Sequence, residues 1–260
     1  MGGLRGKGEL KQVLEFLMTV SNTYFARRIF MTDHTKDNLE KVKKHLQEVL
    51  ELDQNIDYNQ EEAEKHLREF LELDQDADYC KEDAMILDNI GLIYSEMGDL
   101  EEAMKYHQKA LKIFRELDHR EGEAITLNNI GLIYQTKGDL ENALKYHEEA
   151  LKIDQEEGYK DGEAYDLGNI ALIFKAKGDS KNALKYLQEA LKIFREIDHK
   201  EGEEIALSNI GFIYQEKGDL ENALKYLKDA LNIIDKYKFV DGRDVIQNEI
   251  NSITNELEEN

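Results

Sequence analysis

The stretch Asn89-Ile-Gly-Leu-Ile-Tyr94 returns three more times along this chain, each time 40 residues further on. The later copies are Asn129–Tyr134, Asn169-Ile-Ala-Leu-Ile-Phe174 and Asn209-Ile-Gly-Phe-Ile-Tyr214. A Gly-Asp pair follows every copy at the same distance, beginning with Gly98-Asp99. Four copies in register, without a gap, indicate an internal structural repeat.

Each 40-residue unit is predicted to fold as two helices joined at the Gly-Asp pair. Glycine readily takes the left-handed conformation that ends a helix, and aspartate is a strong N-cap for the next one. Ile90 and Tyr94 lie at helical spacing before the pair, and Ala103, Ala110 and Phe114 do so after it. One such pair leaves an apolar face uncovered, so neighbouring units must stack on each other.

This pattern resembles the tetratricopeptide repeat (TPR) family, in the 40-residue form of kinesin light chain, the LGN/Pins spindle adaptor and the bacterial Rap-type peptide receptors. The family's usual proline after the second helix is missing, because the chain contains no proline. The resemblance implies an all-α fold, in which antiparallel helix pairs stack into a right-handed superhelix (an alpha-alpha solenoid). The positions that carry it are Ile90, Gly91, Tyr94, Gly98, Ala103, Ala110 and Leu111, with their equivalents through residue 240.

The repeat register divides most of the chain. We predict a capping helix at 241–260, with Ile246, Ile250 and Ile253 facing inward. Residues 35–80 are interpreted as a degenerate helix pair that caps the other end. The four repeats are predicted at 81–120, 121–160, 161–200 and 201–240.

Residues 1–34 differ from the rest in charge, because they carry five basic and three acidic side chains in a protein of net charge −22. Their apolar residues are spaced for an amphipathic helix. One interpretation is another packed capping helix. A second is an internal ligand that docks into its own array or into that of a neighbouring copy. Docking into a neighbouring copy would make the protein a homo-oligomer.

Composition restricts the function. With 34 basic and 56 acidic side chains the chain repels phosphate backbones, so we expect no nucleic-acid partner and favour neutral to basic protein segments. Cys80 is the only cysteine, so no intrachain disulfide can form. No apolar stretch approaches the roughly 18 residues of a membrane span, and no signal sequence is recognisable. We therefore expect no membrane association and a cytoplasmic protein.

The asparagines that open each repeated hexapeptide are the leading binding candidates. Asparagine is a mediocre helix former, so its presence at one phase of four helices needs a reason. Its amide offers both a donor and an acceptor, which complements a peptide bond. The resemblance to kinesin-light-chain-like and LGN-like proteins implies that these side chains hold a peptide backbone in a concave groove. The alternative is that they form hydrogen bonds between repeats. They are Asn89, Asn129, Asn169 and Asn209.

Other positions of the first helices are predicted to line the same groove, which is then apolar and amide-rich. An acidic rim is expected at the starts of these helices, formed by Glu121, Glu123, Asp161, Glu163, Glu201, Glu203 and Glu204. The groove residues are Ile125, Tyr165 and Ile205 one turn before the asparagines; Leu92, Leu132, Leu172 and Phe212 just after them; and Gln135, Lys175 and Gln215 further along.

No motif for chemistry appears: there is no glycine-rich phosphate loop, paired-histidine zinc helix or nucleophile elbow. We predict no catalytic residue, no cofactor and no metal, and interpret the histidines as packing residues (His107 and His147) or exposed turn residues (His119 and His199). The favoured function is a protein-interaction scaffold. A peptide-responsive sensor and a self-assembling structural repeat are the alternatives.

Overall fold

The structure is a computed structural model that describes residues 81–96, 98–239 and 242–259. Residues 79–260 form one compact unit of the chain, and every element described within it is an α-helix. The described residues include neither the predicted segment at 1–34 nor the predicted degenerate pair at 35–80. The oligomerisation proposed for residues 1–34 therefore stays a prediction.

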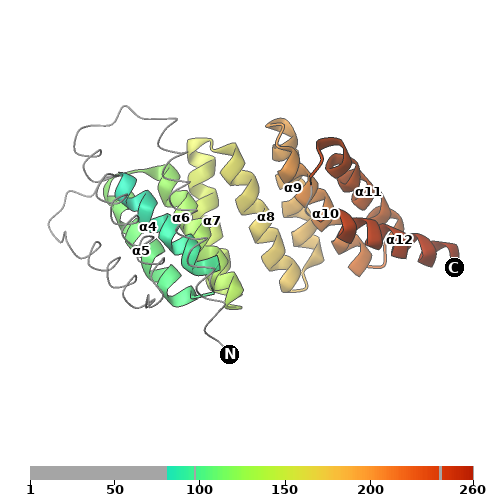
Figure 1. Ribbon diagram of the computed structural model, residues 1–260, viewed down its shortest axis with the longest axis horizontal. Helices are drawn as coiled ribbons and strands as arrows, with labels where there is room; N and C mark the ends of the chain where they lie inside the picture. The colour runs from blue at the N-terminus through green and yellow to red at the C-terminus, as the bar shows by residue number, and fades with distance from the viewer. Residues whose placement is uncertain (1–80, 97, 240–241, 260) are drawn as a thin grey trace, which may run out of the picture. The chain divides into compact units, whose positions relative to one another are not determined.

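The described helices follow one another as antiparallel pairs, one pair per repeat (Figure 1). We call the first helix of each pair the A helix and the second the B helix. The A helices are α4 (Lys81–Glu96), α6 (Arg120–Thr136), α8 (Lys160–Ala176) and α10 (Lys200–Glu216). The B helices are α5 (Leu100–Glu116), α7 (Leu140–Glu157), α9 (Ser180–Glu196) and α11 (Leu220–Tyr237), and α12 (Arg243–Glu259) follows them.

The turn inside each repeat has the predicted chemistry. Gly138 has a φ of 77°, in the left-handed region, and the other three equivalent glycines match it. The carboxylate of Asp139 then accepts a hydrogen bond of 3.1 Å from the backbone N–H of Asn142, which caps α7. The Asn142 side chain donates a second bond to the same carboxylate, and these bonds hold the pKa of Asp139 below its usual range. The Gly-Asp pair is therefore a helix stop followed by a helix start.

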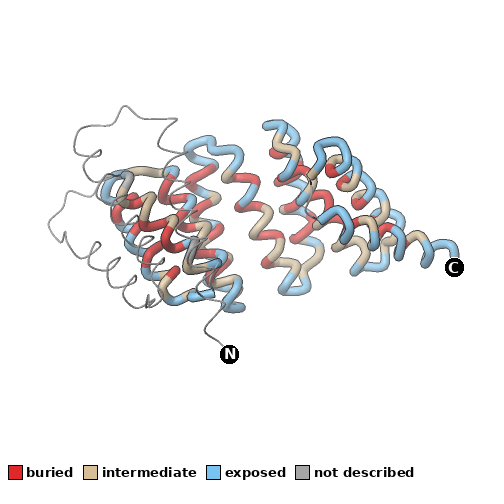
Figure 2. The backbone as a smooth tube through the Cα atoms, in the orientation of Figure 1, coloured by how far each residue is buried: buried red, intermediate tan, exposed pale blue. Residues whose placement is uncertain are grey.

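Buried apolar residues lie between the A and B helices of each repeat (Figure 2), and those of residues 111–153 and 164–253 form separate clusters. Ile90, Ala103, Ala110 and Phe114 are buried as predicted. In every repeat an aromatic side chain near the end of the A helix stacks on a tyrosine of the B helix, with ring centroids about 5.4 Å apart. Gly91 leaves space for a B-helix side chain, since a Cβ there would lie 2.7 Å from the His107 ring.

The carboxyl end of the unit is closed by α12. Its apolar stripe packs on the core of the last two repeats, with Ile246, Ile250 and Ile253 all buried. Arg243 donates from Nε to a carboxylate oxygen of Asp235 at 2.7 Å, which ties the start of α12 to α11. The inward orientation predicted for these isoleucines is confirmed.

Successive A helices contact one another, α4 with α6, α6 with α8 and α8 with α10, whereas successive B helices make less contact or none. The A helices therefore line the tighter side of the stack within this unit. Residues at one phase of the A helix consequently form rows that run from repeat to repeat.

Candidate functional site

The predicted groove residues lie at partly or largely exposed positions of the A helices. Ile125 is 53% exposed and Ile205 is 48% exposed, which is unusual for isoleucine in a packed helix pair. Leu132 and Tyr165 are also exposed, and Leu172 is half-buried. They form one apolar row before the asparagines and a second row after them. We call the two rows and the asparagines the A-helix surface: Leu92, Leu132, Leu172, Phe212, Ile125, Tyr165, Ile205, Asn89, Asn129, Asn169 and Asn209.

Two of the asparagines form hydrogen bonds to the preceding repeat. Asn129 donates from Nδ2 to Oδ2 of Asp88 at 3.0 Å, and Asp88 lies 2.7 Å from Nδ1 of the buried His107 through its other oxygen. Asn169 donates at 3.4 Å to Oδ1 of Asn128. These two side chains therefore connect neighbouring repeats, the role that the sequence left open as the alternative to peptide contact.

Asn209 is different because Gly168 stands where Asp88 and Asn128 stand in the earlier repeats. Glycine has no side chain to accept the bond, and a Cβ built on Gly168 would meet no atom within 4 Å. Among the hydrogen bonds of the described residues, none involves the Asn209 amide. Its half-buried amide therefore has no hydrogen-bond partner within the described part of the A-helix surface.

Two of the three polar residues predicted at the far end of the A helices interact with the next helices of the stack. Lys175 Nζ lies 3.0 Å from a carboxylate oxygen of Glu216, so this predicted groove cation is already paired. Gln215 donates to Glu249 of α12. Gln135 has a buried side-chain oxygen without a donor among the described residues.

The acidic rim is only partly as predicted, because three of its seven residues are exposed and three are buried. Glu123, Glu163 and Glu203 are buried instead of lining an exposed edge, because cationic or amide side chains of the repeat junction bind them. Glu203 accepts from Arg195 Nε at 2.8 Å and from Lys200 Nζ at 2.9 Å. Burial would raise the pKa of Glu203, but these bonds lower it below its usual value. The exposed acids at the A-helix starts are Glu121, Asp161 and Glu201.

Comparison with known families agrees with this architecture. The tetratricopeptide repeat model matches four overlapping stretches, residues 58–116, 82–156, 122–196 and 162–236. The chain belongs to the tetratricopeptide repeat family. No curated protein matches it.

Solved structures similar to this TPR array show the fold. The apo form of RapI is 21% identical with a TM-score of 0.63, over 73% of this chain and 75% of that one. BtubC (BKLC) from P. vanneervenii is 18% identical with a TM-score of 0.58, over 86% and 84%. A putative kinesin light chain of P. anserina with nearly identical TPR-like repeats is 15% identical with a TM-score of 0.55, over 68% and 87%.

The junction between the second and third TPR repeats contains two carboxyls that the sequence prediction missed. Asp154 occupies the position of Phe114 and Phe194, and Asp166 is only 1% exposed. Asp166 accepts from Asn128 through Oδ1, while no donor of the described residues reaches its buried Oδ2. Burial, with the neighbouring Asp154, raises the pKa of Asp166 to about 8, and burial raises that of Asp154 to about 6. The sequence did offer a signal, since Asp154 is a charged residue at the position that phenylalanine takes in the first and third repeats.

The histidines of the TPR array have structural roles. His107 and His147 are fully buried, and neither nitrogen of His147 has a hydrogen-bond partner among the described residues. His119 and His199, expected to be exposed turn residues, are half-buried N-caps instead. Nδ1 of His199 accepts a hydrogen bond of 2.9 Å from the backbone N–H of Gly202, and His119 does the same at Gly122. A histidine can serve here because its ring nitrogen reaches the position that an aspartate oxygen takes at the other turns.

The described part of the chain has neither a membrane span nor a metal-binding cluster. None of its helices is long and apolar enough to cross a membrane. Within the same residues, no group of three or more histidine, cysteine, aspartate or glutamate side chains has the arrangement of a metal site.

Proposed function

We propose that this TPR array is a protein-interaction scaffold that binds one segment of a partner protein along its A-helix surface. The supporting observation is the pair of apolar rows, in which isoleucine, leucine and tyrosine side chains remain exposed at the same phase of successive helices. An isolated exposed apolar residue needs no explanation, but aligned rows of them are typical of interaction sites. Ile125, Tyr165 and Ile205 supply one row.

The asparagine amides would hold the backbone of the bound segment between these rows. An amide can donate to a peptide carbonyl and accept from a peptide N–H, so it recognises an extended chain whatever its sequence. The half-buried amide of Asn209 makes no hydrogen bond to the described residues, since Gly168 removes the acceptor that earlier repeats provide. Asn129 and Asn169 each use their amide nitrogen within the array, and their side-chain oxygens face no donor among the described residues.

The charge of the surface favours a neutral to basic segment with apolar side chains. Glu121, Asp161 and Glu201 are exposed at the starts of α6, α8 and α10, beside the first apolar row. Lys175 is paired with Glu216, so it offers little to an acidic ligand. A lysine or arginine of the partner would find a carboxylate within reach at the edge of each repeat, and opposite charges also speed association.

The test begins with a display library of random peptides selected on the full chain. The selected peptides are then titrated against variants by fluorescence polarisation. We expect Ile205→Glu to weaken binding by about tenfold or more, because it puts a desolvated charge into an apolar contact. Asn209→Ala should weaken it as well, without loss of thermal stability. Ile197→Glu is the matched control, since Ile197 is also exposed but lies at the end of α9, outside the A-helix surface.

Selected peptides that bind Ile205→Glu and Ile197→Glu with equal affinity would contradict the proposal. An enrichment of acidic sequences on the wild-type chain would contradict the charge of the proposed segment. If Ile205→Glu disrupts binding but Asn209→Ala does not, the apolar rows bind the partner and the asparagines serve only the junctions.

A further inference from the structure

The repeat junctions share an ion pair between the end of a B helix and the next A helix. Arg115 donates from Nε to Oε1 of Glu123 at 2.8 Å, and Arg195 donates in the same way to Glu203 at 2.8 Å. In both cases one edge of the guanidinium is fixed by a buried carboxylate. The remaining nitrogens of each arginine then point toward the following B helix.

The two arginines differ in what meets those remaining nitrogens. Nη2 of Arg115 donates to a carboxylate oxygen of Glu149, on α7, at 2.5 Å. Residue 229 of α11 is the equivalent of Glu149, and it is an aspartate, one methylene shorter. Asp229 makes no ion pair with Arg195, and the Nη atoms of Arg195 have no hydrogen-bond or ion-pair partner among the residues described. Arg195 therefore has an unfilled donor position that its counterpart fills.

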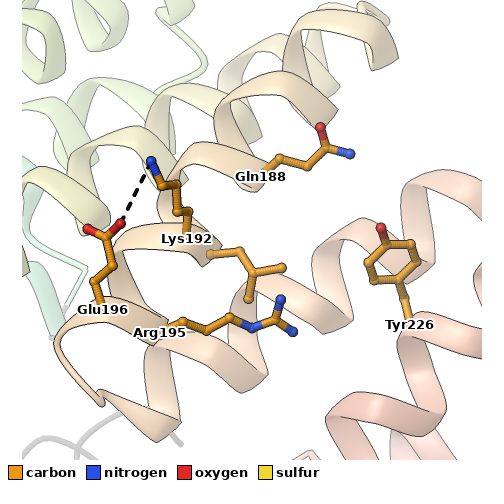
Figure 3. A pocket seen from close by; sticks show the side chains of 6 residues that line it. Gln188, Lys192, Arg195, Glu196 and Tyr226 are labelled. Atoms are coloured by element: carbon orange, nitrogen blue, oxygen red, sulfur yellow. Dashed lines mark ion pairs between the residues drawn. The ribbon is translucent and has the colours of Figure 1, made fainter.

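The unfilled position opens onto a cavity of about 480 Å³ between α9 and α11 (Figure 3). The guanidinium of Arg195 extends in the direction of Tyr226, whose ring is held by stacking on Tyr214 with centroids 5.5 Å apart. Lys192 Nζ lies 3.7 Å from a carboxylate oxygen of Glu196. Arg195 is therefore the lining cation whose terminal nitrogens have no carboxylate partner among the described residues. The lining residues are Gln188, Leu191, Lys192, Arg195, Glu196 and Tyr226.

We propose that this pocket binds a carboxylate from an acidic segment of a partner protein, in the position that Glu149 takes on Arg115. Guanidinium nitrogens favour carboxylates because their paired N–H groups match the two oxygens. The Tyr226 hydroxyl and the Gln188 amide provide further donors, and Leu191 supplies an apolar wall for the methylenes of a glutamate side chain. The site lies on the B helices, so it is separate from the A-helix surface and prefers the opposite charge.

The test uses the full chain and two capped tripeptides, acetyl-Gly-Glu-Gly-amide and its glutamine counterpart, at constant ionic strength. Arginine Nε–Hε resonances are followed by NMR. The glutamate peptide should shift the Arg195 resonance and those of Tyr226 to saturation. The glutamine peptide should not, and the Arg115 resonance should stay in place because Glu149 already occupies it.

Two variants avoid removing Arg195, which also supports the junction through Glu203. Asp229→Glu supplies the carboxylate within the chain, and this tethered competitor should weaken peptide binding at Arg195 by about tenfold or more. Glu149→Asp should do the reverse and make Arg115 respond to the glutamate peptide. The proposal is overturned if Arg195 does not respond to the glutamate peptide, responds equally to glutamine, or responds undiminished in Asp229→Glu. These results are independent of binding at the A-helix surface.

Discussion

Asn129 and Asp88 are joined across the first described repeat junction by a hydrogen bond of 3.0 Å, and the same carboxylate lies 2.7 Å from Nδ1 of His107. One buried aspartate thus connects α4, α5 and α6. Because both of its oxygens are engaged below the protein surface, the group serves the junction, and only the outer side of the asparagine amide is left for a ligand. The role of an asparagine in this array consequently depends on the residue that the previous repeat places opposite it.

Substitution of this aspartate is expected to be costly. Asp88→Ala leaves the buried His107 nitrogen and the Asn129 amide without their acceptor, and an unsatisfied buried group costs roughly 1–3 kcal/mol. Asn209→Ala, which removes no hydrogen bond within the protein, should change the free energy of unfolding by less than about 0.5 kcal/mol. Urea denaturation of the two variants and the wild type measures both values. Equal losses would show that Asp88 contributes no more than an ordinary helix position.

The buried carboxyl pair should make stability fall as the pH rises. The folded pKa values, about 6 for Asp154 and about 8 for Asp166, lie above the ordinary value of 3.8. The folded state therefore binds more protons, and stability is lost between about pH 4 and pH 8 as the unfolded chain ionises first. Asp154→Phe with Asp166→Ala copies the junction of Phe194 and Ala206, and we expect it to gain roughly 1–4 kcal/mol at pH 8 and a flatter profile.

The check is the free energy of unfolding from urea titrations at several pH values between 5 and 9, for the wild type and the double variant. The gain of the double variant over the wild type should grow with pH, and a gain that stays constant or shrinks over this range would contradict the raised pKa values. The double variant also has a geometric precedent, because Phe194 packs on Gly202 as Asp154 packs on Gly162.

His147 should have the opposite effect on the pH dependence of stability, because it should make stability fall as the pH is lowered. Burial lowers its pKa to about 4, against 6.5 when exposed. The unfolded state binds the proton first, so stability contributed by the neutral ring is complete above about pH 6.5 and is lost toward pH 4. His147→Leu copies Leu227, which packs on Gly211 as His147 packs on Gly131. We expect this variant to gain roughly 1–3 kcal/mol by removing two unpaired buried nitrogens, and to lose less stability between pH 6.5 and pH 4.5.

The histidine N-caps give a prediction with a conservative rescue. His199→Ala removes the acceptor for the Gly202 N–H and should cost about 1 kcal/mol, the usual loss for a deleted N-cap side chain. His199→Asn keeps an acceptor at the cap and should recover most of that loss. Thermal melts of the three proteins measure the difference. If asparagine and alanine destabilise equally, the ring contributes through its contact with Phe194, whose centroid lies 5.5 Å away.

Much of the fold was predictable because helix phase and turn chemistry are local. The glycine after each A helix and the aspartate after that fix where helices end and begin, and the structure has both as expected. The inward isoleucines of α12 followed from spacing alone. The packing reason for Gly91 was not readable from the pattern, since the side chain of His107 occupies the space next to it.

The site was harder to predict from the sequence. The position of a residue in the repeat predicts the helix face on which it lies, but not the residue that it contacts in the neighbouring repeat. Glu123 and Glu201 both look like solvated acids near the start of an A helix, and only the position of Arg115 one repeat earlier separates the buried acid from the exposed one. The differing roles of Asn129 and Asn209 likewise depend on Asp88 and Gly168, 41 residues upstream of each.

The carboxyl pair at the α7–α8 interface has a consequence for how the array comes apart. In a solenoid each repeat contacts only its neighbours, so the cooperativity of unfolding depends on every junction between repeats. Above neutral pH the charges of Asp154 and Asp166 should destabilise this junction, so we expect local unfolding of the stack to begin there. A partner segment bound across α6 and α8 would stabilise this junction. The free energy of unfolding would then rise with the fraction of the protein that has the segment bound.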